Sequence, residues 1–148
     1  MKVILSIFSL CLLSGFLCSC YSNKIVVIDA HTLQPVPNAL VLTDKHYMIM
    51  RHVRAYKTNK QGIVYLDYNP TAVYAGKPGY WLGRNDNPNV VFLVPNTENP
   101  ALYTWDKKFP SLYVPYEDLP KTNPLYDEWK VFSEEQLKMR DKIQNMQQ

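Results

Sequence analysis

Three short turn motifs within residues 24–94 constrain the fold of this chain more than any other feature. A proline turn, LQPVPN, separates two apolar runs, a polar turn closed by Gly62 precedes an alternating apolar run, and GKPGY ends a third run. Proline fixes φ and removes a backbone donor, whereas glycine and asparagine tolerate the positive φ that tight turns need. Turns that follow one another this closely leave room only for short strands, so the stretch predicts a β domain.

The apolar runs between these turns predict six or seven strands, with the polar stretch 83–89 as a loop. Asp44 and Lys45 are expected to end the strand over residues 39–43, before a longer strand that starts at Tyr47. The expected strands are residues 25–29, 39–43, 47–58, 64–68, 71–75 and 90–94. Eleven prolines and 13% aromatic residues suit a β protein rich in turns. We therefore expect a mostly β fold, a seven-strand antiparallel β-sandwich over residues 24–95.

The turn motifs also resemble a known family, the carboxypeptidase regulatory-like domain, which has a transthyretin-like (prealbumin) fold related to immunoglobulin-like sandwiches. Asn38 stands where the family usually has glycine, and Asn59 where it has aspartate. The resemblance covers about half of the chain and implies a module on an exported bacterial protein, used for folding support, adhesion or ligand binding. The residues that match the family pattern are Asp29, Pro35, Pro37, Ala39, Gly62, Gly79 and Tyr80.

The start of the chain resembles a bacterial lipoprotein signal. Lys2 precedes an apolar run over residues 3–17, whose length suits a signal peptide and is short for a transmembrane helix. Leu17, Ser19 and Cys20 then match the lipobox, a motif in which the cysteine is acylated and becomes the first residue of the mature protein. Residues 1–19 are thus expected to be removed, and residues 20–23 to form a tether.

The cysteine count agrees with acylation of Cys20. Cys11 and Cys18 lie in the segment expected to be removed, so the mature chain has one cysteine and no internal disulfide. Stable anchoring requires more than one acyl chain, and the resemblance implies that Cys20 carries several. We expect membrane lipid as a partner and a place outside the cytoplasm, in the outer membrane if the organism is Gram-negative, because Tyr21 follows the cysteine. The alternatives are an ordinary secretory signal or an uncleaved membrane helix.

Residues 96–148 are expected to form a C-terminal extension. Prolines and aromatic residues alternate over residues 101–120, which favours an extended segment that wraps the sandwich. Pro124 is expected to open a helical turn, and Ser133 with Gln136 matches a capping box that predicts a helix to about residue 145. Apolar positions are few in that helix, so we expect it to be exposed.

One alternating pattern, His46, Met48, Met50 and His52, suggests a metal site. On one strand these side chains would share a face, and imidazole with thioether ligands suits copper, especially Cu(I). The first and last would lie about 20 Å apart, so at most three neighbours could reach one ion. Alternatively, the methionines fill an apolar face and the histidines flank it.

The aromatic residues Tyr80, Trp81, Tyr103 and Trp105 suggest a stacking surface for a glycan or a peptide. Alternatively, the aromatic residues of the extension simply pack on the sandwich. The chain lacks the serine-hydrolase and zinc-protease sequence motifs, so we expect no enzymatic activity and no cofactor. A formal charge of +3 without a basic run does not indicate a nucleic-acid partner.

These features together predict a membrane-anchored lipoprotein with a non-catalytic binding or structural module in the cell envelope and an unidentified envelope protein as partner. A glycan- or peptide-binding module and a periplasmic copper protein are the alternatives.

Overall fold

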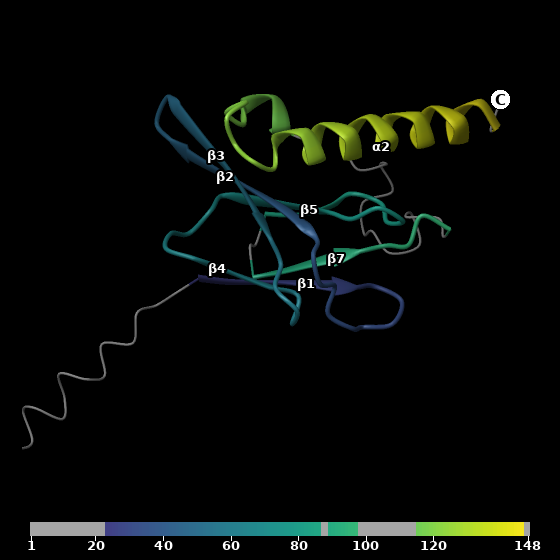
Figure 1. Ribbon diagram of the computed structural model, residues 1–148, viewed down its shortest axis with the longest axis horizontal. Helices are drawn as coiled ribbons and strands as arrows, with labels where there is room; N and C mark the ends of the chain where they lie inside the picture. The colour runs from purple at the N-terminus through teal and green to yellow at the C-terminus, as the bar shows by residue number, and fades with distance from the viewer. Residues whose placement is uncertain (1–22, 87–88, 98–114, 147–148) are drawn as a thin grey trace, which may run out of the picture.

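The computed structural model describes residues 23–86, 89–97 and 115–146. The fold of these residues is mostly β, with seven strands and one long C-terminal helix (Figure 1), as the sequence predicts. The elements are β1 (Asn23–Asp29), β2 (Leu40–Tyr47), β3 (Met50–Lys57), β4 (Ile63–Leu66), β5 (Ala72–Gly76), β6 (Gly83–Asn85), β7 (Val90–Leu93), the short 3-10 helix η3 (Pro115–Asp118) and α2 (Tyr126–Met146).

The strands form two sheets, one of three strands in the order β4-β1-β7 and one of four in the order β3-β2-β5-β6. The expectation that all strands are antiparallel is wrong for one pair, because β1 and β7 run parallel, with Val27 opposite Val91. Parallel neighbours need a long crossover between them. Here the crossover is most of the domain, since the chain leaves β1, builds the four-stranded sheet and then returns to β7.

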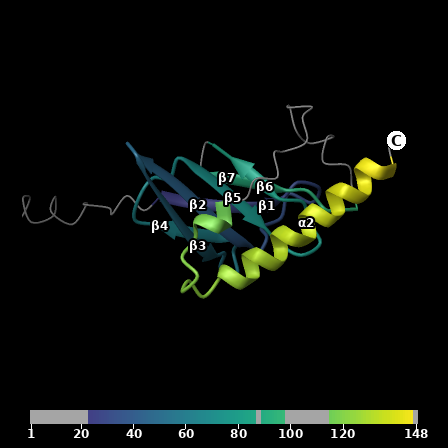
Figure 2. The same cartoon turned by 90° about the horizontal axis from the view of Figure 1, so that it is seen from above.

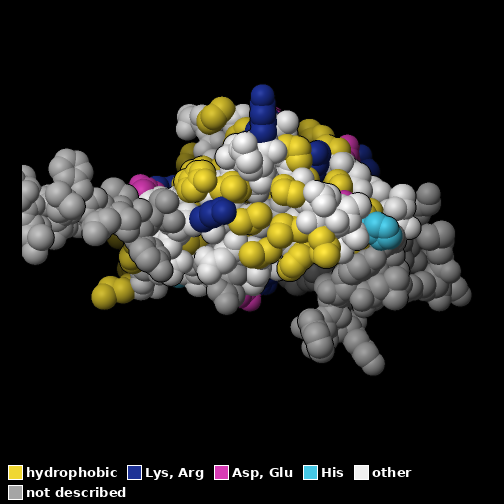
Figure 3. All heavy atoms as spheres, turned by 90° about the horizontal axis from the view of Figure 1, so that it is seen from below, with side chains coloured by type: hydrophobic (Ala, Val, Ile, Leu, Met, Phe, Trp, Pro, Cys, Tyr) yellow, Lys and Arg dark blue, Asp and Glu magenta, His cyan; other side chains and the backbone are white. Residues whose placement is uncertain are grey.

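The two sheets share one apolar cluster, to which strands β1, β2, β4, β5 and β7 contribute. Ile25 and Val27 of β1 are buried in it, whereas the residues between them point to the other face of the sheet. The other strands add Val41, Val64, Leu66, Val73, Ala75, Val91 and Leu93. The outer face of the three-stranded sheet carries the exposed Tyr65 and Phe92, and hydrophobic side chains are visible over this face (Figure 3).

Helix α2 lies on the outer face of the four-stranded sheet, opposite the three-stranded sheet (Figures 1 and 2). Trp129 and Phe132 pack there in a second apolar cluster with Leu42 and Tyr74 of the sheet. A Cβ on Gly76 would lie 2.3 Å from a ring atom of Phe132. The bare glycine in β5 therefore lets the helix approach the strand closely.

The prediction of a short exposed helix starting at Ser133 is wrong, because α2 begins at Tyr126 and is packed on the sheet. Asn123 provides the cap instead, since its Oδ1 accepts the Leu125 N–H at 2.9 Å and Pro124 follows it directly. The Ser133 hydroxyl donates to the Trp129 carbonyl at 2.7 Å, inside the helix. The capping-box motif gives no sign of the buried helical residues Trp129 and Phe132 that precede Ser133.

The predicted break at Asp44 and Lys45 is also wrong. Strand β2 continues through both residues to Tyr47, and a two-residue turn leads into β3 at Met50. The run 47–58 is therefore the turn and return strand of a hairpin, not one strand. The Asp44 carboxylate is buried and bound by the Arg51 guanidinium at 2.6 Å, so its charge does not interrupt the strand. Likewise, the predicted 83–89 loop contains strand β6.

The turn residues adopt the backbone conformations that the motifs predict. Asn38 and Gly62 have φ of 54° and 70°. Gly62 is also required by space, since a Cβ there would lie 2.9 Å from both the Val27 carbonyl oxygen and the Pro35 Cβ. The 3-10 helix η3 lies within the predicted extended segment 101–120, whose first fourteen residues are outside the described part of the chain.

Candidate binding site at the β2–β3 hairpin

The β2–β3 hairpin extends beyond the rest of its sheet. Pairing of β2 with β5 ends at Asp44 opposite Ala72, whereas pairing with β3 continues for three more residues, to Tyr47 opposite Met50. The turn residue Met48 has φ of 49°, in the left-handed region that glycine and asparagine usually occupy. This conformation costs a residue with a side chain about 1–2 kcal/mol. We call Tyr47, Met48, Ile49 and Met50 the hairpin tip.

One face of the hairpin carries a pocket of about 160 Å³. Its side chains come from alternate positions of β2 and β3, with Lys45 directly opposite His52, and from the loop after β4. The lining residues are Lys45, Tyr47, His52, Arg54, Asp67 and Tyr68.

Two cationic side chains stand over tyrosine rings in this pocket. The Lys45 Nζ lies 4.6 Å from the ring centre of Tyr47 and 5.5 Å from that of Tyr68. The Arg54 Cζ lies 4.9 Å from the same Tyr68 ring. Contacts of this kind stabilise a cation and hold it in place. His52 meets the Tyr47 ring edge-on, at 5.9 Å between ring centres.

Tyr68 is the centre of the pocket wall and stays neutral. Burial raises the pKa of its phenol, and its hydroxyl is hydrogen-bonded to the Thr43 hydroxyl. A hydrogen bond with Tyr56 raises the pKa of the Arg54 guanidinium, which is therefore always charged. The carboxylate in the pocket belongs to Asp67, 3.5 Å from Arg54, and its side chain is 81% exposed. Such an exposed pair is weak. Because Lys45 and Arg54 face this one carboxylate, the pocket has an excess of positive charge.

The opposite face of the hairpin holds an ion network around the buried Asp44. Arg51 donates to the Asp44 Oδ2 from Nε and Nη2, at 2.9 and 2.6 Å, and to the Asp118 carboxylate of η3 at 2.5 Å. The His46 Nε2 lies 3.4 Å from the same Asp44 oxygen. Asp44 Oδ1 has no hydrogen-bond partner within the described residues. The network ties the hairpin to the C-terminal extension, which gives it a structural role.

The predicted copper ligands are not brought together. Because Lys45 pairs with His52 and His46 pairs with Arg51, the two histidines lie on opposite faces of the hairpin. Met48 is in the turn and fully exposed, and Met50 begins the return strand. Within residues 23–86, 89–97 and 115–146, no cluster of three or more His, Cys, Asp or Glu side chains could hold a metal ion. The expectation that these four side chains share one face of a single strand is therefore wrong.

The predicted aromatic surface is also divided. The Tyr80 hydroxyl donates to Asp29 at 2.8 Å, and Trp81 is only 5% exposed, so neither side chain presents an open stacking face. Tyr103 and Trp105 lie outside the described residues. The hypothesis of a glycan or peptide surface now depends on those two residues.

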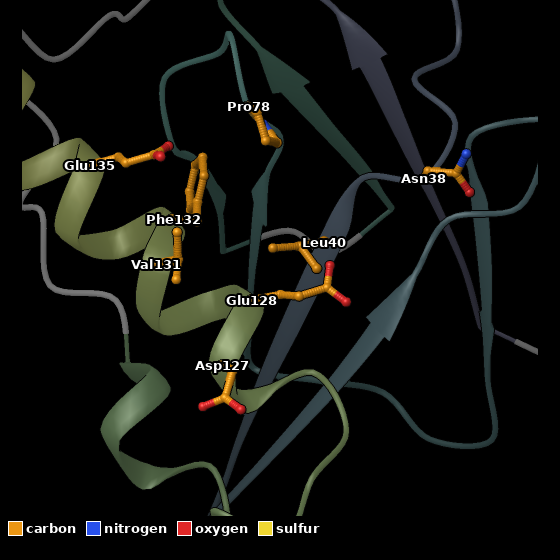
Figure 4. A pocket seen from close by; sticks show the side chains of 8 residues that line it. All are labelled: Asn38, Leu40, Pro78, Asp127, Glu128, Val131, Phe132 and Glu135. Carbon is orange, nitrogen blue, oxygen red and sulfur yellow. The ribbon is translucent and has the colours of Figure 1, made fainter.

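A second cavity, a groove of about 340 Å³, lies between α2 and the edge of the four-stranded sheet. Phe132 and Val131 form its helix side, and Pro78 stands opposite them (Figure 4). The remaining lining residues are Asn38, Leu40, Asp127, Glu128 and Glu135. Lys57 already pairs with Glu128 at 2.8 Å. The groove continues the packing of α2 on the sheet.

Neither a scan against protein-family models nor a search of curated proteins found a match for this chain. Within the described part of the chain, none of the helices has the length and apolar character to cross a bilayer. Lys45, Arg54 and Tyr68 are not among the residues that the sequence motifs single out, although Lys45-x-Tyr47 and His52-x-Arg54 alternate. These alternating residues can be assigned to one face only when the turn at Met48 is known, because that turn sets Lys45 opposite His52.

Proposed function

We propose that this protein is a membrane-anchored bacterial lipoprotein, held through acylated Cys20, whose two sheets form a transthyretin-like sandwich. The sandwich is a non-catalytic binding module that acts outside the cytoplasm, in the cell envelope. The resemblance to the carboxypeptidase regulatory-like domain supports this, as does the lipobox at Leu17, Ser19 and Cys20.

The hairpin pocket is the binding site in this proposal, and its ligand is an anionic group, a phosphate or a carboxylate. The observation that carries this is the pair of cations, Lys45 and Arg54, which stand over the one ring of Tyr68 in one pocket. Charge-assisted hydrogen bonds from lysine and arginine are the usual means of binding such groups.

The size of the pocket limits the ligand. Sites for drug-sized molecules measure roughly 300–1,000 Å³, whereas this pocket measures about 160 Å³. It has room for one small charged group, with the rest of the ligand outside. The module therefore recognises an anionic group displayed by a larger molecule or surface.

A titration with inorganic phosphate tests this function. Chemical shifts should move at Lys45, His52 and Arg54 in nuclear magnetic resonance spectra, with millimolar affinity. Lys45→Gln or Arg54→Gln should weaken binding about tenfold, because each removes a charge-assisted hydrogen bond of about 1.5 kcal/mol.

Arg140→Gln is the matched control, since Arg140 pairs with its chain neighbour Asp141, at 2.9 Å on α2. It should leave the affinity unchanged. Equal affinity for phosphate in the native protein and in the Lys45→Gln, Arg54→Gln double variant would remove the pocket from the proposal.

A further inference from the structure

The hairpin tip exposes four consecutive apolar side chains. Met48 and Ile49 are 104% and 98% exposed, and Tyr47 and Met50 are more than half exposed. Soluble surfaces rarely carry such a run unless it has a function. In addition, the left-handed backbone at Met48 places a large apolar side chain where turns favour glycine or asparagine. Neither the solubility nor the local folding of the hairpin explains these residues.

The position of the tip in the molecule indicates what it contacts. The hairpin tip and the start of β1 both lie at the left-hand end of the described structure in Figures 1 and 2. Strand β1 begins at Asn23, three positions after Cys20. A chain anchored at Cys20 therefore brings this end of the molecule to the bilayer.

The length of the hairpin fits the depth of a membrane interface. Three residues of β2 extend past its last pair with β5, which at about 3.3 Å per residue places Tyr47 about 10 Å beyond that edge. Apolar faces of interfacial elements sink about 5–10 Å into the boundary between head groups and acyl chains. The overhang allows the tip to enter this region while the body of the domain stays in water.

The charge of the hairpin fits the same surface. Residues 45–52 include two cations and two histidines and no carboxylate. Arg51 is engaged by Asp44 and Asp118, so Lys45, beside the tip, is the cation that faces the anionic head groups. Tyr47 belongs to both the tip and the pocket, and tyrosine is a residue that favours the membrane interface.

From these observations we infer that the hairpin tip inserts into the interface of the membrane to which the chain is anchored, and so fixes the orientation of the domain. The inference rests on the anchored location in the proposed function. A protein partner at the tip is the competing occupant, and it would leave Met48 and Ile49 in water when only lipid is present.

The test replaces the acyl anchor, so that it does not depend on acylation. Residues 20–148 with Cys20→Ser carry an N-terminal hexahistidine and are held on vesicles of phosphatidylcholine, phosphatidylglycerol and a nickel-chelating lipid. Ile49→Cys or Met48→Cys then supplies the single thiol for an environment-sensitive fluorophore. Val131→Cys is the control, because Val131 is an exposed apolar residue on α2, away from the hairpin.

At positions 48 and 49, vesicle binding should shift the emission to shorter wavelength and reduce quenching by iodide several-fold, whereas position 131 should not change. Equal iodide quenching of the tip labels on vesicles and in solution would overturn the inference. So would equal protection at position 131, because the contact would then not belong to the tip. Acylation of Cys20 is measured separately by mass, so failure of the anchor and failure of the tip are distinguishable.

Discussion

The Asp29 carboxylate links the turn that follows β1 to the GKPGY turn that follows β5. It accepts the backbone N–H groups of His31 and Thr32 and the Tyr80 hydroxyl, each at 2.8 Å. Burial alone would raise the pKa of this carboxyl group, but the hydrogen bonds from Thr32, Tyr80 and His31 outweigh it, so the pKa is lowered. The motif residues Asp29 and Tyr80, far apart in the sequence, therefore act together to hold a turn.

Asp29→Asn should destabilise the protein by about 2 kcal/mol at pH 7, because hydrogen bonds to a charged acceptor are lost. The folded-state pKa lies below the unfolded value of about 3.9, so this stabilisation is present above that pH and is lost as the pH falls toward the folded-state pKa. Urea unfolding between pH 7 and pH 2.5 should show the gap between the two proteins closing below about pH 4.

The control for this prediction is Asp86→Asn, whose carboxylate pairs with Arg84 at the surface and should contribute little. A constant gap between native protein and Asp29→Asn over the whole pH range would contradict the role of the Asp29 charge.

At the scale of elements, α2 is attached to the β domain by a polar contact as well as by its apolar face. Gln136 is buried, its Oε1 accepts the Leu82 N–H at 3.1 Å, and its Nε2 donates to the Tyr80 carbonyl at 2.9 Å. The chain segment that these groups belong to connects β5 with β6. The helix thus satisfies backbone groups that the sheet leaves unpaired, which fixes its register along the strand.

Gln136→Leu should destabilise the protein by about 2–4 kcal/mol, since it leaves one buried donor and one buried acceptor unsatisfied. Urea unfolding gives the free energy, and amide hydrogen exchange should show faster opening of α2 than of β1. Leu137→Gln on the exposed side of the helix is the control and should have little effect. A loss confined to the β strands, with α2 unchanged, would contradict the contact.

At the scale of the whole molecule, the two ends have different roles. One end gathers the family-like turns around Asp29, where the chain is held by hydrogen bonds. The other end combines the start of β1 with the hairpin tip (Figure 1), and the hairpin also carries the cationic pocket. The proposed acyl anchor would turn this second end to the membrane, and α2, whose first turns lie nearest that end, would extend away from the lipid boundary.

Acylation of Cys20 is the prediction on which this orientation depends. The native protein should be recovered from the membrane fraction, with a mass above that of residues 20–148 by the mass of its acyl chains. Cys20→Ser should abolish the added mass and release the protein, because several chains at about 0.8 kcal/mol per buried CH2 hold the native form. Cys18→Ser should leave both results unchanged, and a mature chain that starts elsewhere without lipid would exclude the lipoprotein assignment.

Most strands and turns could be located from local sequence patterns. Asn38, Gly62 and Gly79 all have positive φ, as their turn motifs require. The alternation of Val64 and Leu66 with the exposed Tyr65 likewise marked the core face of β4. These features could be predicted because φ preferences and side-chain alternation are local properties of a few neighbouring residues.

The contacts between distant segments, in contrast, became known from the three-dimensional fold alone. The turn at Met48 carries no turn residue, the charge of Asp44 is compensated by Arg51, and the start of α2 follows from burial of Trp129 against the sheet. The parallel pairing of β1 with β7 and the cationic pocket have the same origin. Each of these features depends on contacts between residues that are distant in the chain. The free energy of such contacts cannot be deduced from a local pattern of residues.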